Sequence, residues 1–259
     1  MTNYYFLATL LPDLQIGVPP EIDFYEFAEL LKMNLSKADF EKVQTIQRYY
    51  DIQNVRSFWR EETLSHRGSF DEKELEEAFL TKSGLPEYVY DFEERYDSKN
   101  DRLHHFASLI SSYFDEEIPK ATGFLREYLE FERGLRLVLT GLRSKLLKRD
   151  IMTELQYENS DDNIVAQLIA QKDSTEYEPP SKFSEVKVLY EENCEKPFQL
   201  HKMLAEYRFE KITEMVGAEF FTIDRILAYM VKLIIVEKWL ELDKKKGMEI
   251  VDTIVKEAS

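Results

Sequence analysis

The amino-acid sequence predicts an all-α protein. Apolar residues recur at spacings of three, four and seven along most of the chain, as they do on one face of an α-helix. Glycine and proline are scarce, at eight each in 259 residues, and both interrupt helices. No segment shows the strict alternation of polar and apolar residues that is typical of a half-buried strand. These three observations favour long helices and no sheet.

Capping patterns place the helices of the first third. After the break at Val18-Pro19-Pro20, an apolar stripe predicts a helix from Phe24 to Leu31. Ser36 is expected to begin a longer helix that continues toward Trp59. The residues from Ser69 to Glu72 read as a capping box for a short helix, and Pro86 suits the first position of the next one.

The remaining helices follow from the same spacing. Residues 103–113 predict one helix, and Pro119 precedes the longest pattern, which runs to Leu146. A short helix is expected over 164–169, and another from Pro197 that Gly217 ends as a left-handed C-cap. Thr222 is expected to cap a further helix that Gly247 ends.

Composition breaks divide the chain into one multi-lobed helical domain, residues 1–259. The segment 172–184 contains Pro179-Pro180 and polar residues, and it is the strongest linker candidate. We therefore expect lobes at 1–98, 99–171 and 185–259. Inside the long middle pattern, Gly134 and Gly141 are seven residues apart and share one helical face. Because glycine costs about 1 kcal/mol in a helix interior, the pair predicts close approach of another helix.

The charge of the chain excludes some partners. The net charge is −16 and the isoelectric point is near 4.8, which argues against nucleic-acid binding and against direct attraction to an acidic membrane. Residues 71–97 hold ten carboxylates against three basic residues. This acidic edge either serves solubility or docks a basic partner. Its candidate partner-binding residues are Glu74, Glu77, Glu93 and Glu94.

Positive charge gathers in the second half of the long middle helix, from Arg133 and Arg136 to Arg149. It either complements the helix dipole, contacts the acidic edge of the same chain, or contacts acidic loops of a partner. Arg133 and Arg136 are the partner-binding candidates, because they lie too far from the helix end for the dipole to explain.

Candidate chemistry is sparse. Asp101 and His104 have the spacing of a di-iron ligand pair, but the nearest second pair, Glu62 and His66, has a different spacing and lies in an expected loop. Cys194 is the only cysteine, and phosphate-binding glycine loops are absent. We therefore expect no catalytic residues, no metal, no nucleotide site and no cofactor. The longest apolar stretch, Ile226 to Val236, is too short to span a bilayer, and no signal peptide is visible.

Two segments carry a resemblance to known proteins. The motif Phe221-Thr222-Ile223-Asp224-Arg225-Ile226-Leu227-Ala228-Tyr229 resembles the C-terminal segment of the C subunit of V/A-type ATPases, which corresponds to the d subunit in eukaryotes. The opening Tyr4-Tyr5-Phe6-Leu7-Ala8-Thr9-Leu10-Leu11-Pro12-Asp13-Leu14 resembles that of an uncharacterised family encoded among bacterial V-type ATPase genes. The resemblance to the C subunit implies pseudo-repeated helical bundles, with three helical units that each carry a short signature. The segment that matches this signature best is Asp51-Ile52-Gln53-Asn54-Val55-Arg56. Looser matches are Phe131 to Arg136 and Val236 to Leu240.

The resemblance implies a non-catalytic peripheral component that couples the central stalk of a V/A-type ATPase to its membrane rotor ring. Its partners would be the central stalk proteins and that ring, with no nucleic acid. Its place would be cytoplasmic, at the inner membrane through the ATPase complex alone. The alternatives are an assembly or regulatory factor that binds the ATPase transiently, and a helical di-iron enzyme.

Overall fold

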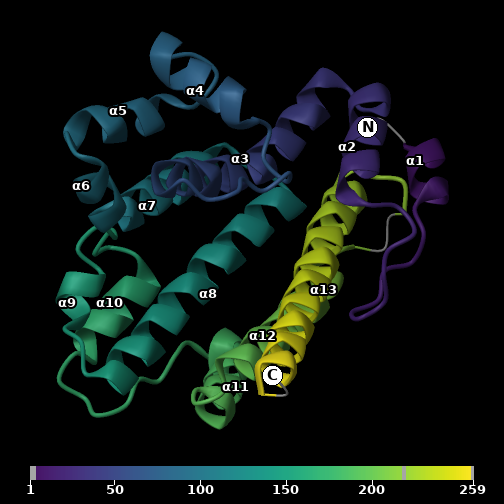
Figure 1. Cartoon of the computed structure of the whole chain (residues 1–259). Coiled ribbons are helices and arrows are strands. Elements are labelled where there is room, and N and C mark those ends of the chain that lie inside the picture. The colour runs from purple at the N-terminus through teal and green to yellow at the C-terminus, as the bar shows by residue number, and fades with distance from the viewer. Residues whose placement is uncertain (1–3, 218–219, 258–259) are drawn as a thin grey trace. The chain divides into compact units, whose positions relative to one another are not determined.

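The computed structural model is helical throughout (Figure 1). It describes residues 4–217 and 220–257, and the side chains of these residues up to Lys244. No β-strand occurs within these ranges, as the sequence predicts. The chain divides into two compact units, one of residues 1–40 with 195–259 and one of residues 41–194. Their boundaries differ from those of the three lobes expected from the sequence, and the lobes stay a prediction.

Unit 1 brings the two ends of the chain together. Its helices are α1 (Tyr5–Leu10), α2 (Phe24–Asn34), α12 (Pro197–Met215) and α13 (Ile223–Glu257), with the first turn of α3 (Lys37–Arg60). α12 and α13 form an antiparallel hairpin, because Lys202 pairs with Asp243 at 2.6 Å whereas Phe209 lies under Lys232 nearer the turn. α1 and α2 pack on α13.

The core of unit 1 is centred on α13. Between Ile226 and Val236 nearly every side chain except those of Tyr229 and Lys232 is buried. Phe27 of α2 is fully buried and its ring lies 5.1 Å from that of Tyr229. Such a continuous apolar run is typical of a helix covered on most of its faces, and burial of each large side chain stabilises the fold by roughly 1.5–3 kcal/mol.

Unit 2 contains the remaining helices. They are the rest of α3, then α4 (Glu72–Thr81), α5 (Glu87–Arg95), α6 (Lys99–His104), α7 (Phe106–Glu117), η1 (Ile118–Lys120), α8 (Phe124–Leu147), α9 (Ile151–Glu154), α10 (Asn163–Ala170), η2 (Ser181–Phe183) and α11 (Ser184–Asn193). α8 is the central helix and packs against α7, α9, α10 and α11.

The two glycines of α8 lie where other segments approach it closely, as the sequence predicts. A Cβ atom on Gly134 would lie 2.7 Å from the Phe183 ring, and one on Gly141 would lie 2.3 Å from a methyl group of Leu168 in α10. Both distances are shorter than real carbon contacts, so only glycine fits without movement of the neighbours.

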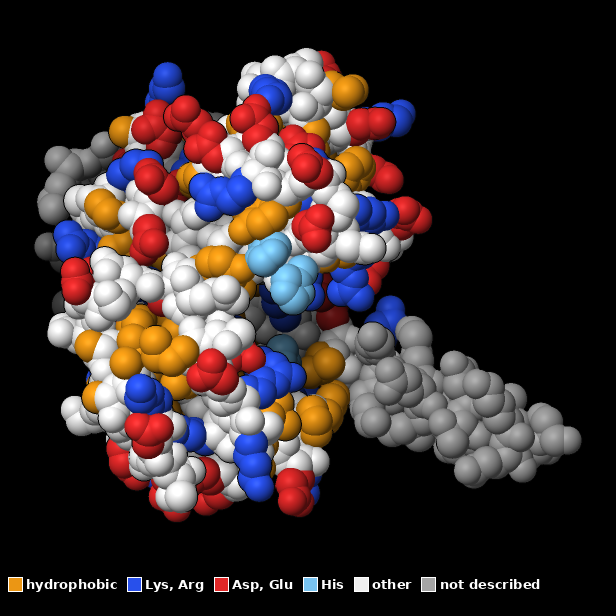
Figure 2. Space-filling view, turned by 90° about the vertical axis from the view of Figure 1, so that its left-hand side faces the viewer, with side chains coloured by type: hydrophobic (Ala, Val, Ile, Leu, Met, Phe, Trp, Pro, Cys, Tyr) orange, Lys and Arg blue, Asp and Glu red, His pale blue; other side chains and the backbone are white. Residues whose placement is uncertain are grey.

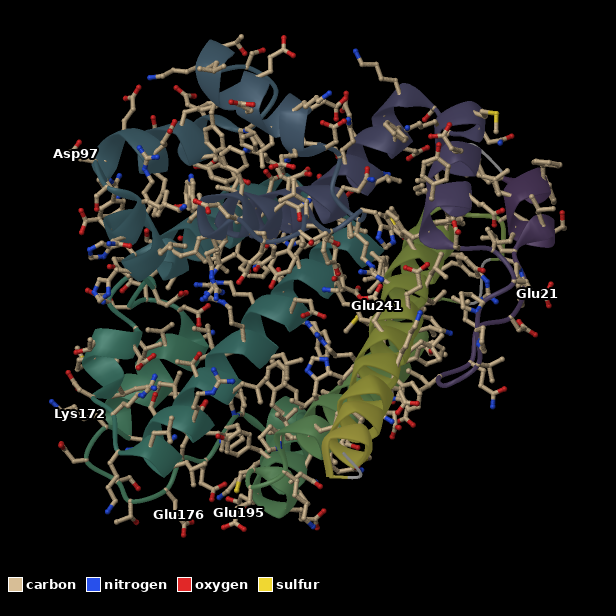
Figure 3. All side chains as sticks on the ribbon, viewed as in Figure 1. Glu21, Asp97, Lys172, Glu176, Glu195 and Glu241 are labelled. Carbon is tan, nitrogen blue, oxygen red and sulfur yellow. The ribbon has the colours of Figure 1, made fainter. Side chains whose placement is uncertain are left out.

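The segment 172–184 lies within unit 2 and packs against α8. Tyr177 and Phe183 are both 1% exposed, and their rings lie against Gly141 and Gly134. Lys172 and Glu176, in contrast, point outward from the loop after α10 (Figure 3). The segment therefore has the polar surface of a linker and two aromatic anchors that hold it on α8.

Several helix ends differ from the sequence expectation. The capping box of α4 is formed by Asp71 and Glu74, not by Ser69 and Glu72. The N–H of Ser69 instead donates to the buried carboxylate of Asp51, so a tertiary hydrogen bond replaces the local cap. Pro86 is the N-cap of α5, one position before its first helical residue.

Breaks within the expected helices also differ. Residues 103–113 belong to two helices, α6 and α7, which meet at His105. α12 ends through an extended Val216, and Gly217 is not left-handed. α13 continues through Gly247, whose cost of about 1 kcal/mol does not end a helix that is already long. α11 was not expected. In the portion of the chain described, no helix has both the length and the apolarity needed to cross a membrane.

Candidate functional site

The acidic edge of the sequence is a charged surface of unit 2. Figure 2 shows acidic side chains in its upper part, around α4 and α5, with basic side chains between them. Glu74 and Glu77 are exposed on α4, and Glu74 completes the capping box. Glu93 pairs with Arg102 at 3.2 Å, and Glu94 pairs with Lys82. Three of the four candidates thus have a role within the fold, and partner binding by the four stays a prediction.

Arg133 and Arg136 are held by carboxylates of their own chain. Arg133 pairs with Asp162 at 2.6 Å and Arg136 pairs with Glu158 at 2.5 Å. The Glu158 side chain is 4% exposed and also accepts a hydrogen bond from Ser111. Because an unpaired buried carboxylate is costly, the two arginines stabilise this part of the core. The carboxylates belong to the 158–162 turn and not to the acidic edge.

The basic end of α8 has a similar structural role. Lys145 donates to three backbone carbonyls, those of Gln171, Lys172 and Ser174, at 2.6–2.8 Å. These carbonyls lie at and beyond the C-terminus of α10, where helix carbonyls have no partner within the helix. Lys145 therefore closes the end of α10, a role that sequence reasoning did not identify.

The signature at residues 51–56 holds the loop 65–69 in place by hydrogen bonds. Asn54 is buried, donates to the carbonyl of Ser65 at 2.9 Å and accepts from its N–H at 2.7 Å. Asp51 accepts from the N–H of Ser69 at 2.5 Å. A Cβ atom on Gly68 would lie 2.4 Å from Asp51, so the loop can approach only as glycine. Burial raises the pKa of Asp51 to about 6 despite these hydrogen bonds.

The other two signature copies also hold the start of a neighbouring helix. Arg133 pairs with Asp162, the N-cap of α10. Glu237 accepts from the N–H of Phe24, the first residue of α2, at 2.8 Å. In the first copy, Asp51 binds the loop that leads into α4. All three signatures thus lie where a long helix meets the beginning of a shorter one.

In two of the copies, an arginine lies over an aromatic ring of a neighbouring helix, α7 in both cases. Arg56 is 5.3 Å from the ring centre of Phe106, and Arg136 is 5.5 Å from that of Phe114. Both rings belong to α7. A guanidinium over an aromatic face is attractive by about 0.5–2 kcal/mol, so each arginine helps to fix its helix against α7.

The histidines considered as metal ligands belong to separate segments. His104 ends α6, and its ring lies 4.8 Å from that of His105, which stacks on Tyr96 at 4.5 Å. His66 lies in the loop before α4. Over the residues whose side chains are described, no group of three or more histidine, cysteine, aspartate or glutamate residues is placed to hold a metal ion.

The two segments that carry the family resemblance meet in unit 1. The N–H of Tyr4 donates to the carbonyl of Phe221 at 2.9 Å, and the Tyr5 and Phe221 rings lie 4.2 Å apart. Tyr4 is buried, and its hydroxyl donates to Asp39 at 2.5 Å. The N-terminal segment is therefore fixed to the start of α3 at one point and to the entrance of α13 at another.

These segments line a cavity of about 390 Å³, hereafter the unit 1 cavity, together with residues 213 and 216; its lining residues are 8, 9, 11–14, 213, 216, 220, 221, 225, 226, 228, 229 and 232. One face of α13 supplies Arg225, Tyr229 and Lys232, which are spaced by four and three residues. Asp13 of the N-terminal segment also lines the cavity. Most of the remaining wall is apolar.

Lys232 and Tyr229 of the unit 1 cavity are partly buried, and burial shifts the pKa of each. Burial, followed by the positive charge of Arg225, lowers the pKa of Lys232, and Asp13 opposes this shift. Lys232 lies 4.2 Å from the Phe209 ring centre. Burial raises the pKa of Tyr229 to about 12, and among the described residues its hydroxyl has no hydrogen-bond partner.

Sequence reasoning quoted this motif but did not single out its polar residues. The signal that could have found them is the regular spacing of Arg225, Tyr229 and Lys232 in a stretch, residues 225–236, that is otherwise apolar. The cavity itself depends on the N-terminal segment, more than 200 residues away in the sequence, which no local pattern predicts.

A family model described as "Protein of unknown function (DUF2764)" matches residues 1–258. The chain belongs to this family. Members in Chlamydia muridarum and Chlamydia trachomatis are each 28% identical over 262 residues, and one in Chlamydia pneumoniae is 29% identical. Each match covers 99% of this chain and 98% of the relative, and each relative is described as an uncharacterized protein. No solved structure matches the chain.

Proposed function

We propose that this member of the DUF2764 family is a non-catalytic peripheral component of a V/A-type ATPase, a coupler between the central stalk and the membrane rotor ring that is similar to the C subunit of those enzymes. The observation that carries the proposal is the hydrogen-bonded junction of Tyr4 with Phe221, because both resembling segments build one site. One segment resembles the C subunit and the other resembles an uncharacterised family encoded among V-type ATPase genes, so the two resemblances concern one part of the fold.

The three signature copies support the same proposal. In each copy a signature residue fixes the start of a shorter helix beside a longer one. A coupler must transmit force through packed surfaces, so such rigid junctions between helices suit the role. The buried ion pairs of Glu158 and the close packing at Gly134 add to that rigidity.

Coupling would take place outside the lipid. The chain would lie on the cytoplasmic side and reach the inner membrane through the rotor ring alone. Its net charge of −16 suits a basic surface on the central stalk and is repelled by acidic lipid headgroups.

Affinity purification of the tagged chain from mildly solubilised membranes tests the proposal. A coupler should bring down central stalk proteins and the rotor ring in a fixed ratio, and the ratio should survive gel filtration. Recovery with partly assembled complexes only would indicate an assembly factor. Recovery of neither stalk nor ring would contradict the proposal.

A further inference from the structure

The unit 1 cavity holds two cations on a protein that is otherwise strongly acidic. Arg225 and Lys232 both line it, two helical turns apart on the same face of α13. Asp13 is the one described carboxylate in the lining, and it forms no ion pair within 4.0 Å with either cation. The described lining therefore carries two cations against one carboxylate, so its net charge is positive.

The rest of the cavity suits an apolar guest. Its volume of about 390 Å³ lies within the range of ligand sites, and most of its wall is hydrocarbon. Tyr229 also lines the cavity, and its hydroxyl is buried without a described partner. Two cations in an apolar wall form the complement of a carboxylate attached to an apolar body.

The rim favours a protein as the source of that carboxylate. Phe220 lines the cavity and is 60% exposed, and Tyr5, whose ring lies 4.2 Å from that of Phe221 in the lining, is 56% exposed. Exposed aromatic side chains beside a pocket are typical of protein interfaces. A free fatty acid would fill the cavity and leave this aromatic rim in water, whereas a protein segment would cover both.

We propose that the unit 1 cavity is a docking site for a partner protein that inserts an acidic side chain flanked by apolar residues. The carboxylate lies between Arg225 and Lys232, and the flanking apolar residues cover Phe220 and Tyr5. The proposal concerns the chemistry of the partner segment and holds whether or not that partner belongs to an ATPase.

A selection from a random peptide display library on the full-length chain tests this proposal. The expected winners carry one aspartate or glutamate beside leucine, isoleucine or phenylalanine. Fluorescence anisotropy then gives the dissociation constant of the best synthetic peptide. Arg225→Gln and Lys232→Gln should each weaken binding about tenfold, the size expected for a hydrogen bond to a charged group.

Matched variants separate contact from misfolding. Arg225→Lys keeps the charge and should bind more tightly than Arg225→Gln. Lys32→Gln removes an exposed cation from α2, away from the cavity lining, and should leave binding unchanged. Changing the peptide's glutamate to glutamine should weaken binding to the native chain more than binding to Lys232→Gln, since that variant has already lost one of the two cations that contact the carboxylate.

Three results would overturn the proposal. The first is enrichment of apolar peptides without an acidic residue. The second is peptide binding that neither cation variant alters although circular dichroism shows both to be folded. The third is binding of laurate with no peptide enriched, which would assign the cavity to a fatty acid and not to a protein.

Discussion

Tyr4 and Phe221 are joined by a backbone hydrogen bond of 2.9 Å although 216 residues lie between them. The bond ties the N-terminal segment to the start of α13 and makes the unit 1 cavity a product of both ends of the chain. Any change that loosens this junction should therefore affect the cavity even when it lies outside the lining.

Gly134 should tolerate no side chain. In Gly134→Leu the new atoms would meet the Phe183 ring, so we expect the free energy of unfolding to fall by about 1–3 kcal/mol or more. Gly134→Ala should also destabilise, because the 2.7 Å contact outweighs a helix-propensity gain of about 1 kcal/mol. Urea denaturation measures both. Gly217→Ala is the control, since no atom lies within 4 Å of its Cβ position. A more stable Gly134→Ala would contradict the packing described.

Glu158 should be required for the stability of unit 2. In Glu158→Gln, Arg136 loses its carboxylate partner whereas Arg133 keeps Asp162, and we expect a loss of about 1.5–3 kcal/mol. Glu130→Gln removes an exposed pair with Arg126 on the same α8 and should cost less than about 1 kcal/mol. Thermal unfolding of the two variants compares them directly, and equal losses would show that the Glu158 pairs contribute no more than surface pairs.

Asp51 should make the protein less stable as pH rises. Its pKa is about 6 in the folded chain and 3.8 as a reference, so the folded state binds more protons between these values. The stabilisation is complete below pH 3.8 and is lost as pH rises through 6, by about 3 kcal/mol in total.

The variant Asp51→Asn isolates this effect, because an amide does not titrate. Denaturation at a series of pH values should show the native chain losing stability relative to Asp51→Asn between about pH 4 and pH 7. Parallel curves for the two proteins would mean that the Asp51 carboxyl titrates alike in the folded and unfolded chains.

The acidic edge should control the rate of docking to a basic partner. Replacing Glu74, Glu77, Glu93 and Glu94 with glutamine should slow association with the central stalk most at low salt, where the Debye length is about 30 Å, and least at 1 M, where it is about 3 Å. Because Glu93 and Glu94 form exposed or half-buried ion pairs, the variant should lose only about 1–2 kcal/mol of stability. Stopped-flow kinetics measures the rates.

A second variant separates the edge from total charge. It removes four exposed carboxylates elsewhere in the chain, those of Asp161, Asp173, Glu192 and Glu195. It should associate at nearly the native rate. Equal slowing of both variants would show that net charge matters and that residues 71–97 form no special surface.

The sequence was sufficient where a pattern has one physical meaning. The spacing of Gly134 and Gly141 predicts close packing because only a near neighbour compensates for two glycines in one helix. The expected helix cap was wrong where a residue distant in the sequence binds the group that was expected to form a local hydrogen bond. Ser69 does not cap α4 because both its N–H and its hydroxyl are hydrogen-bonded to Asp51, and no local pattern contains that information. Arg225 and Lys232 become a site only once residues 8–14 are placed against them.

Assembly from purified parts tests most directly whether the chain couples stalk and ring. Central stalk proteins and the detergent-solubilised rotor ring of a V/A-type ATPase from the same organism are mixed with and without the chain, and the products are weighed by native mass spectrometry. We predict a complex of stalk, chain and ring that does not form when the chain is left out. A stalk and ring that join equally well without the chain, or a chain that binds neither, would contradict the proposed role.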